Sequence, residues 1–543
     1  MFNYLESDLE EATLEWLAEM DFSILAGPDI AHEGVYPERD SYRDVVLTER
    51  LRDALFRINP NVPKEAIELA VQKIEANESP NLVINNQKFH RMVTDGLDIE
   101  LQGKDGYNPT EKVWLFDFEN STNNDFVAVN QFTVIEGNQN KRPDVLVFVN
   151  GLPLVVIELK NATNENTGIS EGYNQLQTYK QTIPSLFRYN AFLITSDGIN
   201  ARIGSLTANE ERFMKWRTID GLELAPTSLS QLEVLLKGVL EPTRFMDIIR
   251  NFILFQTDGE NTYKILAAYH QFHAVNKAVE KANIAVQGDK RIGVIWHTQG
   301  SGKSLSMVFY AGKLIQAMNN PTIVVLTDRN DLDDQLFNTF SISGDILRQT
   351  PSQANSRDEL RKLLSVESGG IIFTTLQKFA PDEDTGVMPC LTNRSNVIVM
   401  ADEAHRSQYG FGATVRGNEA ETKYGFAKYV RDALPNASFI GFTGTPVEAT
   451  DKNTPAVFGD YIDIYDMTQA VEDGATVKIF YESRIIPLDL PSDLTLDDEY
   501  EEITEDQELA VKEKLKSKWS RLEALAGAES RVKRLAEDVV KHY

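Results

Sequence analysis

The chain has 543 residues, of which 42% are hydrophobic and 25% charged, a composition typical of a globular protein with a sizeable core. Its formal net charge of −28 argues against a surface coated with charge for unspecific DNA binding, although an acidic protein can still line one channel with basic residues. The single cysteine excludes an intrachain disulfide framework and a cysteine-based zinc site. Because the sequence contains neither a membrane-length apolar run nor a signal-peptide pattern, we expect a cytoplasmic protein without a membrane span.

The first part of the chain predicts helices followed by strands. Apolar residues recur at helical spacing over residues 9–20, 45–57 and 64–74. Runs rich in β-branched and aromatic residues then predict strands over residues 112–117 and 126–135. The order indicates a mixed α/β domain.

A hairpin with an apolar interior is predicted next. Two apolar runs, residues 144–149 and 154–160, flank Asn150-Gly151, which is a preferred two-residue turn between antiparallel strands. A later apolar run over residues 191–195 predicts a further strand. Polar residues at the open end of this hairpin would therefore emerge directly from the core.

Two carboxylates and a lysine meet at that open end. Asp144 begins the first strand, while Glu158 and Lys160 are two residues apart near the end of the second and so point to one face. Carboxylates can hold Mg²⁺, which polarises a phosphodiester and lowers the pKa of a bound water, and a lysine can position that water or stabilise developing charge. The arrangement resembles the PD-(D/E)xK nuclease motif, although Glu-x-Lys alone also occurs in exposed ion pairs.

The nuclease resemblance extends to flanking helices. Gln175 and Tyr179, on a helix that follows the hairpin, resemble the Gln-x-x-x-Tyr motif of some nucleases of this class. A glutamate from the first helix often completes such sites. Glu11 and Glu10 are the candidates, and the sequence does not choose between them.

A second landmark is a glycine-rich turn at residues 296–304. It follows an apolar run, residues 292–295, and precedes a predicted helix over residues 305–315. Strand, tight glycine turn and helix together form the context of a phosphate-binding loop, in which backbone N–H groups and the helix N-terminus face the phosphates. We therefore predict a nucleotide site here.

The residue types in this turn fit ATP and Mg²⁺. Lys303 would reach the β- and γ-phosphates, and Ser304 would bind the Mg²⁺. One departure is visible, because His297 stands where the usual pattern opens with glycine. The remaining predicted nucleotide-binding loop residues are Gly300, Ser301 and Gly302.

Four apolar runs with helices between them follow the loop. They span residues 322–326, 371–375, 397–400 and 439–442 and predict a parallel sheet covered on both faces. Ligands bind at the carboxyl ends of the strands in such sheets. Polar residues follow several of these runs, as a nucleotide site at that edge requires.

An Asp-Glu-Ala-His sequence follows the third run. Asp402 would hold Mg²⁺–ATP through water, and Glu403 beside it would orient the hydrolytic water. The order of these motifs is similar to superfamily 2 helicases and translocases. That resemblance implies that Thr443 and Thr445 belong to a coupling motif and that His405 links it to the nucleotide site.

The same resemblance suggests further contacts. A helix predicted over residues 263–275 carries Gln271, which resembles the glutamine that contacts adenine in helicase-like ATPases; the alternative is a solvent-facing helix glutamine. Arg329, Thr374 and Thr375 would face the nucleic-acid backbone.

A PD-(D/E)xK nuclease followed by an Asp-Glu-Ala-His motor resembles the restriction (R) subunit of type I restriction-modification enzymes. The motifs at residues 297–304, 401–407 and 441–446 are all similar to that family. The resemblance implies an ATP-driven translocase on double-stranded DNA that cleaves unmethylated DNA with Mg²⁺. It also implies two kinds of partner, the methyltransferase (modification) subunit and the specificity subunit.

Four regions are expected. A nuclease domain (1–225), a helical linker (226–260) and a first RecA-like domain (261–470) are followed by the lead-in to a second RecA-like domain (471–543). The sequence contains no Gln-x-x-Gly-Arg-x-x-Arg motif, which a complete second domain would carry. We therefore expect a truncated chain.

Three alternatives stay open at this point. The nuclease fold could have lost its activity beside a helicase-like ATPase, or the chain could be a non-catalytic assembly module. A repair or transport ATPase is a weaker alternative, because it would not account for residues 142–179.

Overall fold

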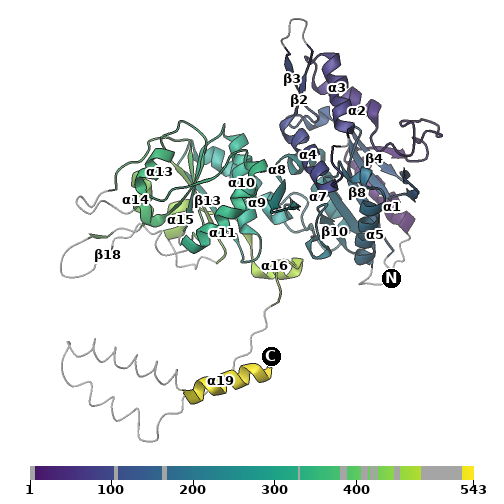
Figure 1. Ribbon diagram of the computed structural model, residues 1–543. Coiled ribbons are helices and arrows are strands. Elements are labelled where there is room, and N and C mark those ends of the chain that lie inside the picture. Colours follow the sequence, from purple (N-terminus) through teal and green to yellow (C-terminus); the bar gives the residue numbers. More distant parts are fainter. Residues whose placement is uncertain are drawn as a thin grey trace, which may run out of the picture. The chain divides into compact units, whose positions relative to one another are not determined.

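The computed structural model describes most of the chain, in two compact units, residues 1–476 and 477–543. The described residues are 6–76, 78–102, 108–161, 168–327, 330–379, 388–404, 414–415, 422–423, 426–445, 453–478 and 529–542. The first unit contains two α/β regions, each built on its own sheet (Figure 1).

The first sheet has six strands in the order β1-β4-β7-β8-β9-β10. Pairs β1–β4 and β8–β9 are parallel and the others antiparallel. Every residue of β7 and β8 is buried, which explains their continuous apolar sequence. The strands are β1 (Ser23–Ala26), β4 (Phe126–Asn130), β7 (Val145–Val149), β8 (Leu152–Leu159), β9 (Phe192–Ser196) and β10 (Ala201–Gly204).

The predicted hairpin is confirmed as β7–β8. Asn150 and Gly151 both have positive φ, 52° and 77°, as a two-residue turn of this type requires. A Cβ at Gly151 would lie 2.4 Å from the carbonyl oxygen of Leu47, so the turn also needs glycine for space.

Two predicted strands are shorter than expected. The strand predicted over 112–117 ends at Val113, because the backbone of Trp114 bonds the side chain of Asn59 instead of a neighbouring strand. The strand predicted over 126–135 breaks after Asn130, where Gln131 takes a φ of 53°. The short hairpins are β2 (Leu97–Glu100) with β3 (Thr110–Val113) and β5 (Val134–Glu136) with β6 (Gln139–Lys141).

The predicted helices of the first region are present with shifted ends. Its helices are α1 (Glu6–Glu19), α2 (Thr48–Ile58), α3 (Lys64–Glu75), α4 (Leu82–Asp95), α5 (Gly168–Thr182) and α6 (Pro184–Phe187), with 3₁₀ turns at Ser121–Asn123 and Glu210–Arg212. Helices α7 (Gln231–Leu240) and α8 (Pro242–Asn251) follow.

The helix predicted over 263–275 is wrong in its first half. Strands β11 (Ile253–Asp258) and β12 (Asn261–Leu266) form a hairpin, and helix α9 begins only at Tyr269 and ends at Ala285. The turn contains Gly259 at a φ of 60°, and burial alternates along the second half of β12. Lys264 is buried there and donates to Asn86 Oδ1 at 2.8 Å, so the strand is held by a tertiary contact that local periodicity does not reveal.

The second sheet has seven parallel strands in the order β15-β16-β14-β17-β20-β13-β21. This confirms the predicted parallel sheet, which includes the strand expected before the glycine-rich turn (β13), and β15 and β21 add one strand at each edge. The strands are β13 (Arg291–His297), β14 (Thr322–Thr327), β15 (Ser352–Gln353), β16 (Ile371–Thr375), β17 (Val397–Ala401), β20 (Ser438–Thr443) and β21 (Tyr461–Tyr465).

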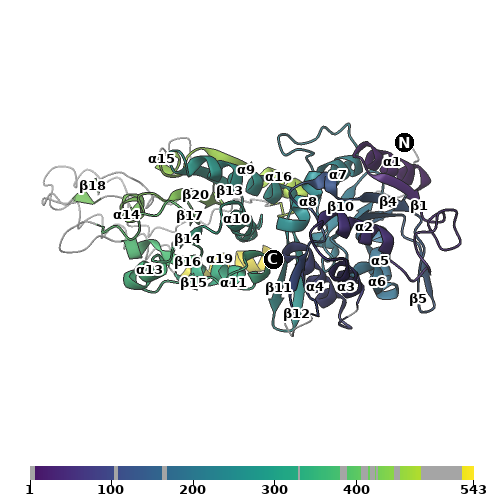
Figure 2. The same ribbon diagram turned by 90° about the horizontal axis from the view of Figure 1, so that it is seen from above.

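Helices cover both faces of this sheet. Helices α13 and α14 lie on one side, and α9, α10 and α11 on the other (Figures 1 and 2). The helices are α10 (Lys303–Ala317), α11 (Asn330–Ser341), α12 (Gly344–Leu347), α13 (Arg357–Leu363), α14 (Phe426–Ala433), α15 (Asn453–Phe458) and α16 (Met467–Asp473); a 3₁₀ turn spans Leu376–Phe379, and β18 (Thr414–Val415) pairs with β19 (Thr422–Lys423).

Helix α8 connects the cores of the two regions. Phe245 contacts Phe192 of the first sheet, with ring centroids 5.6 Å apart. Phe252, directly after the helix, contacts Phe272 of α9 and Phe309 of α10 at 4.7 and 5.8 Å. One contiguous hydrophobic core therefore runs from Leu9 to Ala470, and a second cluster of buried residues lies on the other face of the second sheet.

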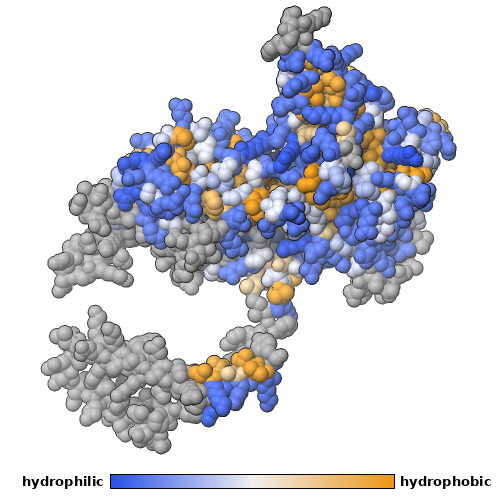
Figure 3. All heavy atoms as spheres, in the orientation of Figure 1, coloured by the Kyte–Doolittle hydropathy of each residue, from blue (hydrophilic) through white to orange (hydrophobic). Residues whose placement is uncertain are grey.

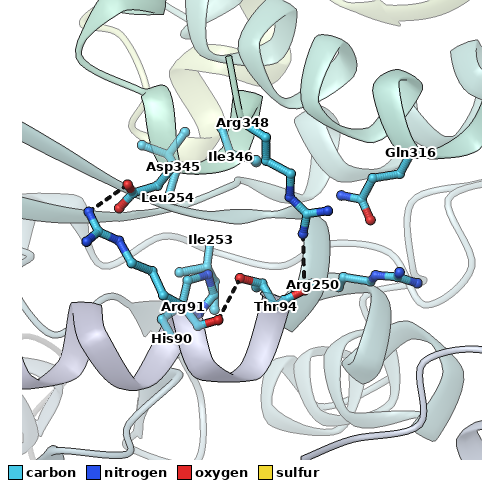
Figure 4. A pocket seen from close by; sticks show the side chains of 10 residues that line it. All are labelled: His90, Arg91, Thr94, Arg250, Ile253, Leu254, Gln316, Asp345, Ile346 and Arg348. Atoms are coloured by element: carbon cyan, nitrogen blue, oxygen red, sulfur yellow. Dashed lines mark hydrogen bonds and ion pairs between the residues drawn. The ribbon is translucent and has the colours of Figure 1, made fainter. Parts of the chain in front are cut away.

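Polar contacts reinforce this junction where α4 meets α12. Arg91 pairs with Asp345 at 2.7 Å, and Arg348 pairs with Asp95 at 2.9 Å. Figure 4 shows a pocket between these elements, with the Arg91–Asp345 pair on one side of it. The pocket is lined by His90, Arg91, Thr94, Arg250, Ile253, Leu254, Gln316, Asp345, Ile346 and Arg348.

Helix α19 (Glu529–His542) is the described element of the second unit. Val532, Leu535 and Val539 are each 45–49% exposed and form an apolar side opposite a hydrophilic one (Figure 3). Within the described ranges, no helix combines the length and the apolar character needed to cross a membrane.

We expect Asn150→Ala to destabilise the fold by about 3 kcal/mol, because it leaves buried backbone groups without partners. Asn150 accepts from Asp125 N at 2.8 Å and donates to Leu115 O at 2.9 Å. Urea unfolding followed by circular dichroism measures the change. Asn174→Ala, at an exposed position of α5, is the matched control. Equal midpoints for the two variants would contradict the prediction.

Candidate active sites

Asp144, Glu158 and Lys160 come together at the open end of the β7–β8 hairpin. The antiparallel register pairs Val145 with Ile157, so the start of β7 lies beside the end of β8. Asp144 Oδ2 accepts from the backbone N–H of Leu159 at 2.7 Å, and Lys160 Nζ lies 2.6 Å from Glu158 Oε1. The geometry predicted for these three side chains is therefore present.

Helix α1 adds carboxylates to this cluster, although Glu11 is not among those that face it. Glu11 is exposed, whereas Glu6 Oε1 lies 3.1 Å from Lys160 Nζ. Glu10 accepts from Asn130 and Gln131 at 2.7 and 2.5 Å. Of the two glutamates considered from the sequence, the structure thus favours Glu10, and it adds Glu6. The i, i+4 spacing of Glu6 and Glu10, which places both on one helix face, was the signal in the sequence.

Burial dominates the electrostatics of the cluster. It raises the pKa of Asp144 to about 6. Burial, and then the negative charge of Asp144, raise the pKa of Glu158 to about 7, while the Lys160 ammonium acts in the opposite direction. The pKa of Glu158 is therefore close to neutral pH, and binding of a cation would strongly favour the ionised carboxylate.

The cluster fits a magnesium site with few protein ligands. Glu158 is 2% exposed, and its Oε2 has no hydrogen-bond partner among the described residues, so a buried oxygen is available. In the part of the chain that the structure describes, no group of three or more His, Cys, Asp or Glu residues is arranged to hold a metal. Mg²⁺ commonly takes one or two carboxylates and completes its shell with water and substrate phosphates. A site with the available oxygen of Glu158 and without three protein ligands among the described residues is therefore consistent with Mg²⁺.

Tyr179 and Gln175 lie on α5 beside this cluster. Burial and the nearby Glu158 charge raise the pKa of the Tyr179 phenol above its ordinary value, and Gln175 is a hydrogen-bond partner of this phenol. The two residues of the predicted Gln-x-x-x-Tyr motif are thus placed next to a candidate metal ligand.

The glycine-rich turn joins β13 to α10 as predicted. Gly300 and Gly302 have φ of 82° and 83°, conformations that turn the backbone into an anion-binding concavity at the N-terminus of α10. His270 lies 3.0 Å from the carbonyl oxygen of Ser301. Lys303 is the first residue of α10, and Ser304 follows it.

Gln271 is not the solvent-facing glutamine of the alternative interpretation. It is 5% exposed and donates to the carbonyl oxygen of Gly302 at 3.0 Å. Its Oε1 accepts from the backbone N–H of Ala268 at 2.9 Å. Gln271 therefore connects the start of α9 to the loop, and contact with adenine stays a prediction.

The residues after β17 and β20 surround Lys303. Its Nζ lies 3.6 Å from Glu403 Oε1. A Cβ at Gly444 would lie 2.4 Å from the same Nζ, so glycine provides the space for the lysine. Glu403 has a φ of 49°, a strained conformation at the predicted water-orienting position. The backbone N–H of Asp402 donates to Leu326 O at 2.9 Å, which places it at the carboxyl edge of the sheet.

Other predicted site residues are placed as follows. Thr443 Oγ1 accepts from the backbone N–H of Thr445 at 3.2 Å, which shapes the predicted coupling motif. Thr374 and Thr375 are 0% and 3% exposed at the end of β16, so neither offers its side chain to DNA as it stands. Arg329 and His405 lie outside the described residues.

His297, the departure from the usual loop pattern, has a structural partner. It is fully buried, and its Nε2 lies 3.1 Å from Asp463 Oδ1. Asp463 also pairs with Lys277 of α9 at 3.0 Å. Because Asp463 lies on β21, which is outside the strands predicted from the sequence, this partner could not be predicted.

Tyr465 and Asp473 are further residues near the loop that the sequence did not indicate. The Tyr465 ring stacks on His270, with centroids 3.9 Å apart and planes 7° apart. Its hydroxyl donates to Asp473 Oδ2 at 2.9 Å, and Asp473 Oδ1 pairs with Arg217 at 3.0 Å. The side of the loop that faces α16 is therefore held by aromatic and charged contacts.

Both halves of the chain match known families. Residues 3–212 match the family described as type I restriction enzyme R protein N terminus. Residues 270–513 match the family described as SWI2/SNF2 ATPase. The fold and the sites thus define a restriction-type N-terminal domain joined to a helicase-like ATPase.

Curated relatives match the chain from end to end. The type I restriction enzyme HindI endonuclease subunit of Haemophilus influenzae is 46% identical over 99% of this chain and 51% of its own length. A relative from Methanocaldococcus jannaschii, provisionally named as the type I restriction enzyme MjaIXP endonuclease subunit, is 34% identical over 98% of this chain and 51% of its own. The chain belongs to the family of type I restriction enzyme endonuclease subunits, and it spans about half the length of these relatives.

The raised carboxyl pKa values predict a pH dependence of stability in metal-free buffer. Above about pH 4, Glu158 loses its proton in the unfolded chain but keeps it in the folded chain. The contribution of Glu158 to the free energy of unfolding is therefore largest at low pH and is lost as the pH rises through about 7. Glu158→Gln should therefore raise Tm by about 3–6 °C at pH 8 and have little effect near pH 4. Differential scanning calorimetry at both pH values checks this. A lower Tm for the variant at pH 8 would show that the sign is wrong.

Proposed function

We propose that this chain carries the nuclease and the first motor domain of a type I restriction enzyme, which translocates double-stranded DNA with ATP and cleaves it with Mg²⁺. The observation that carries the nuclease assignment is the convergence of Asp144, Glu158 and Lys160 around a buried oxygen without a described partner. We keep the domain limits expected from the sequence, with the nuclease in residues 1–225 and the ATPase in residues 261–470.

In the nuclease site, Asp144 and Glu158 would bind Mg²⁺, which polarises the scissile phosphodiester and acidifies a water when bound. Lys160, at 21% side-chain exposure, is placed to orient the attacking water or to stabilise charge on the phosphate. Gln175 and Tyr179 border the ligand Glu158 and would hold its orientation. Glu10, fixed by two amides, would complete the acidic side of the site.

In the motor site, Lys303 and the loop residues Gly300 to Gly302 would bind the ATP phosphates, and Ser304 with Asp402 would hold Mg²⁺. Glu403 would orient the hydrolytic water. Thr443, Thr445 and His405 would couple the nucleotide site to DNA, which Arg329 would contact; the buried side chains of Thr374 and Thr375 are not assigned this contact. The support is the placement of Lys303 between Glu403 and Gly444 at the edge of a parallel sheet.

The family relationship supports the choice of substrate and partners. The relatives are named as endonuclease subunits of type I restriction enzymes. We propose accordingly that unmethylated DNA is the substrate, that modification and specificity subunits are the partners, and that the protein acts in the cytoplasm.

Asp144→Ala should abolish Mn²⁺ binding to the nuclease site, because it removes one of two proposed carboxylate ligands. Calorimetric titration without nucleotide measures the binding. Asp258→Ala, at the exposed end of β11, is the matched control and should bind like the wild type. In the restriction complex, Glu158→Ala should lower DNA cleavage by at least about 100-fold. Unchanged cleavage by this variant would exclude the assignment.

Lys303→Ala should weaken binding of a fluorescent ATP analogue by about 10- to 100-fold, because a charge-assisted contact to the phosphates is lost. The exposed Lys281→Ala on α9 removes the same charge away from the loop and should change little. Fluorescence anisotropy at fixed Mg²⁺ compares the two. Equal losses in both variants would mean that the loop does not bind the phosphates through Lys303.

A further inference from the structure

We propose that Glu6 is a positioning residue for the nuclease: it takes the Lys160 ammonium when Mg²⁺ binds to Glu158. This inference rests on the proposed nuclease function and assigns a role to a residue outside the nuclease motif.

All three hydrogens of the Lys160 ammonium are directed to acceptors. The ammonium lies 2.6 Å from Glu158 Oε1, 3.1 Å from Glu6 Oε1 and 2.9 Å from the carbonyl oxygen of Leu159. Two of these acceptors belong to β8, and the third belongs to α1. The lysine therefore connects the helix to the hairpin.

A divalent cation and this ammonium compete for the same carboxylate. Lys160 already neutralises Glu158, whose side chain is only 2% exposed. A doubly charged ion on Glu158 would repel the adjacent ammonium, and at short range inside a protein such repulsion is strong. The lysine must then give up Glu158 as its main partner, and it needs another acceptor if it is to remain at the site.

Glu6 can be that acceptor. Its side chain is 43% exposed, so it has room to follow the ammonium, and it already contacts Nζ. Glu10, one helical turn further along α1, is less suited, because its two oxygens are engaged by Asn130 and Gln131. The two glutamates therefore have different roles: Glu10 is held beside Asp144, and Glu6 pairs with Lys160.

The test is a double-mutant cycle on Mn²⁺ affinity, measured by calorimetry on the full chain at pH 8. Glu6→Gln should weaken Mn²⁺ binding by about five- to tenfold, because the ammonium then stays on Glu158. In the Lys160→Met background, the same Glu6→Gln change should alter the affinity by less than about twofold. Glu15→Gln, an equal charge change at an exposed position of α1, should have little effect in either background.

An equal loss of affinity in both backgrounds would show that Glu6 acts on the metal directly, and the positioning role would be wrong. Glu6→Gln without effect in either background would also overturn it. Both results leave the proposed nuclease intact, since the wild type still binds Mn²⁺. A wild-type chain that binds no Mn²⁺ would instead remove the proposed nuclease function and this inference together.

Discussion

The cost of burying a carboxylate governs the N-terminal half of the molecule. Glu158 is the seventh residue of a strand buried along its whole length, so its charge is removed from water by the same packing that forms the hairpin. An isolated buried charge would be strongly unfavourable, and the surroundings must compensate for it. The surroundings of Glu158 meet this requirement. The Lys160 ammonium pairs with the carboxylate, Glu6 contacts that ammonium, and Tyr179 lies beside Glu158.

The ATPase half is organised by backbone conformation instead of burial of charge. Two glycines with positive φ shape the loop, and His270 and Gln271 of α9 contact its carbonyl groups. His297 adds a buried contact to β21 through Asp463. These contacts hold the loop in one conformation. Its N–H groups can therefore bind an anion with little loss of the loop's conformational entropy.

The sequence predicted the parts of both sites that depend on local pattern. The turn at Asn150-Gly151, the buried strands and the strand–loop–helix context of Lys303 all follow from periodicity and turn preferences. What it did not predict depends on contacts between distant segments. β12 was read as helix because its buried Lys264 finds partners only in the fold, and Asp463 could not be matched with His297 before β21 was known. The helical spacing of Glu6 and Glu10 indicates that they share a face, but the contact of Glu6 with Lys160, 154 residues away, follows only from the fold.

The hydrophobic core that α8 shares between the two sheets has a consequence for how the two regions can evolve. Phe245 and Phe252 join aromatic residues on either side, so one face of the second sheet shares its apolar core with the first region, while the other face has a core of its own. Mutations that unfold the region of the second sheet should therefore destabilise the first region as well, and fragments that keep only residues of the first sheet would expose apolar surface to chaperones and proteases. The shared core also predicts that exchange of the two regions between diverged relatives succeeds only when the residues around α8 are exchanged with them.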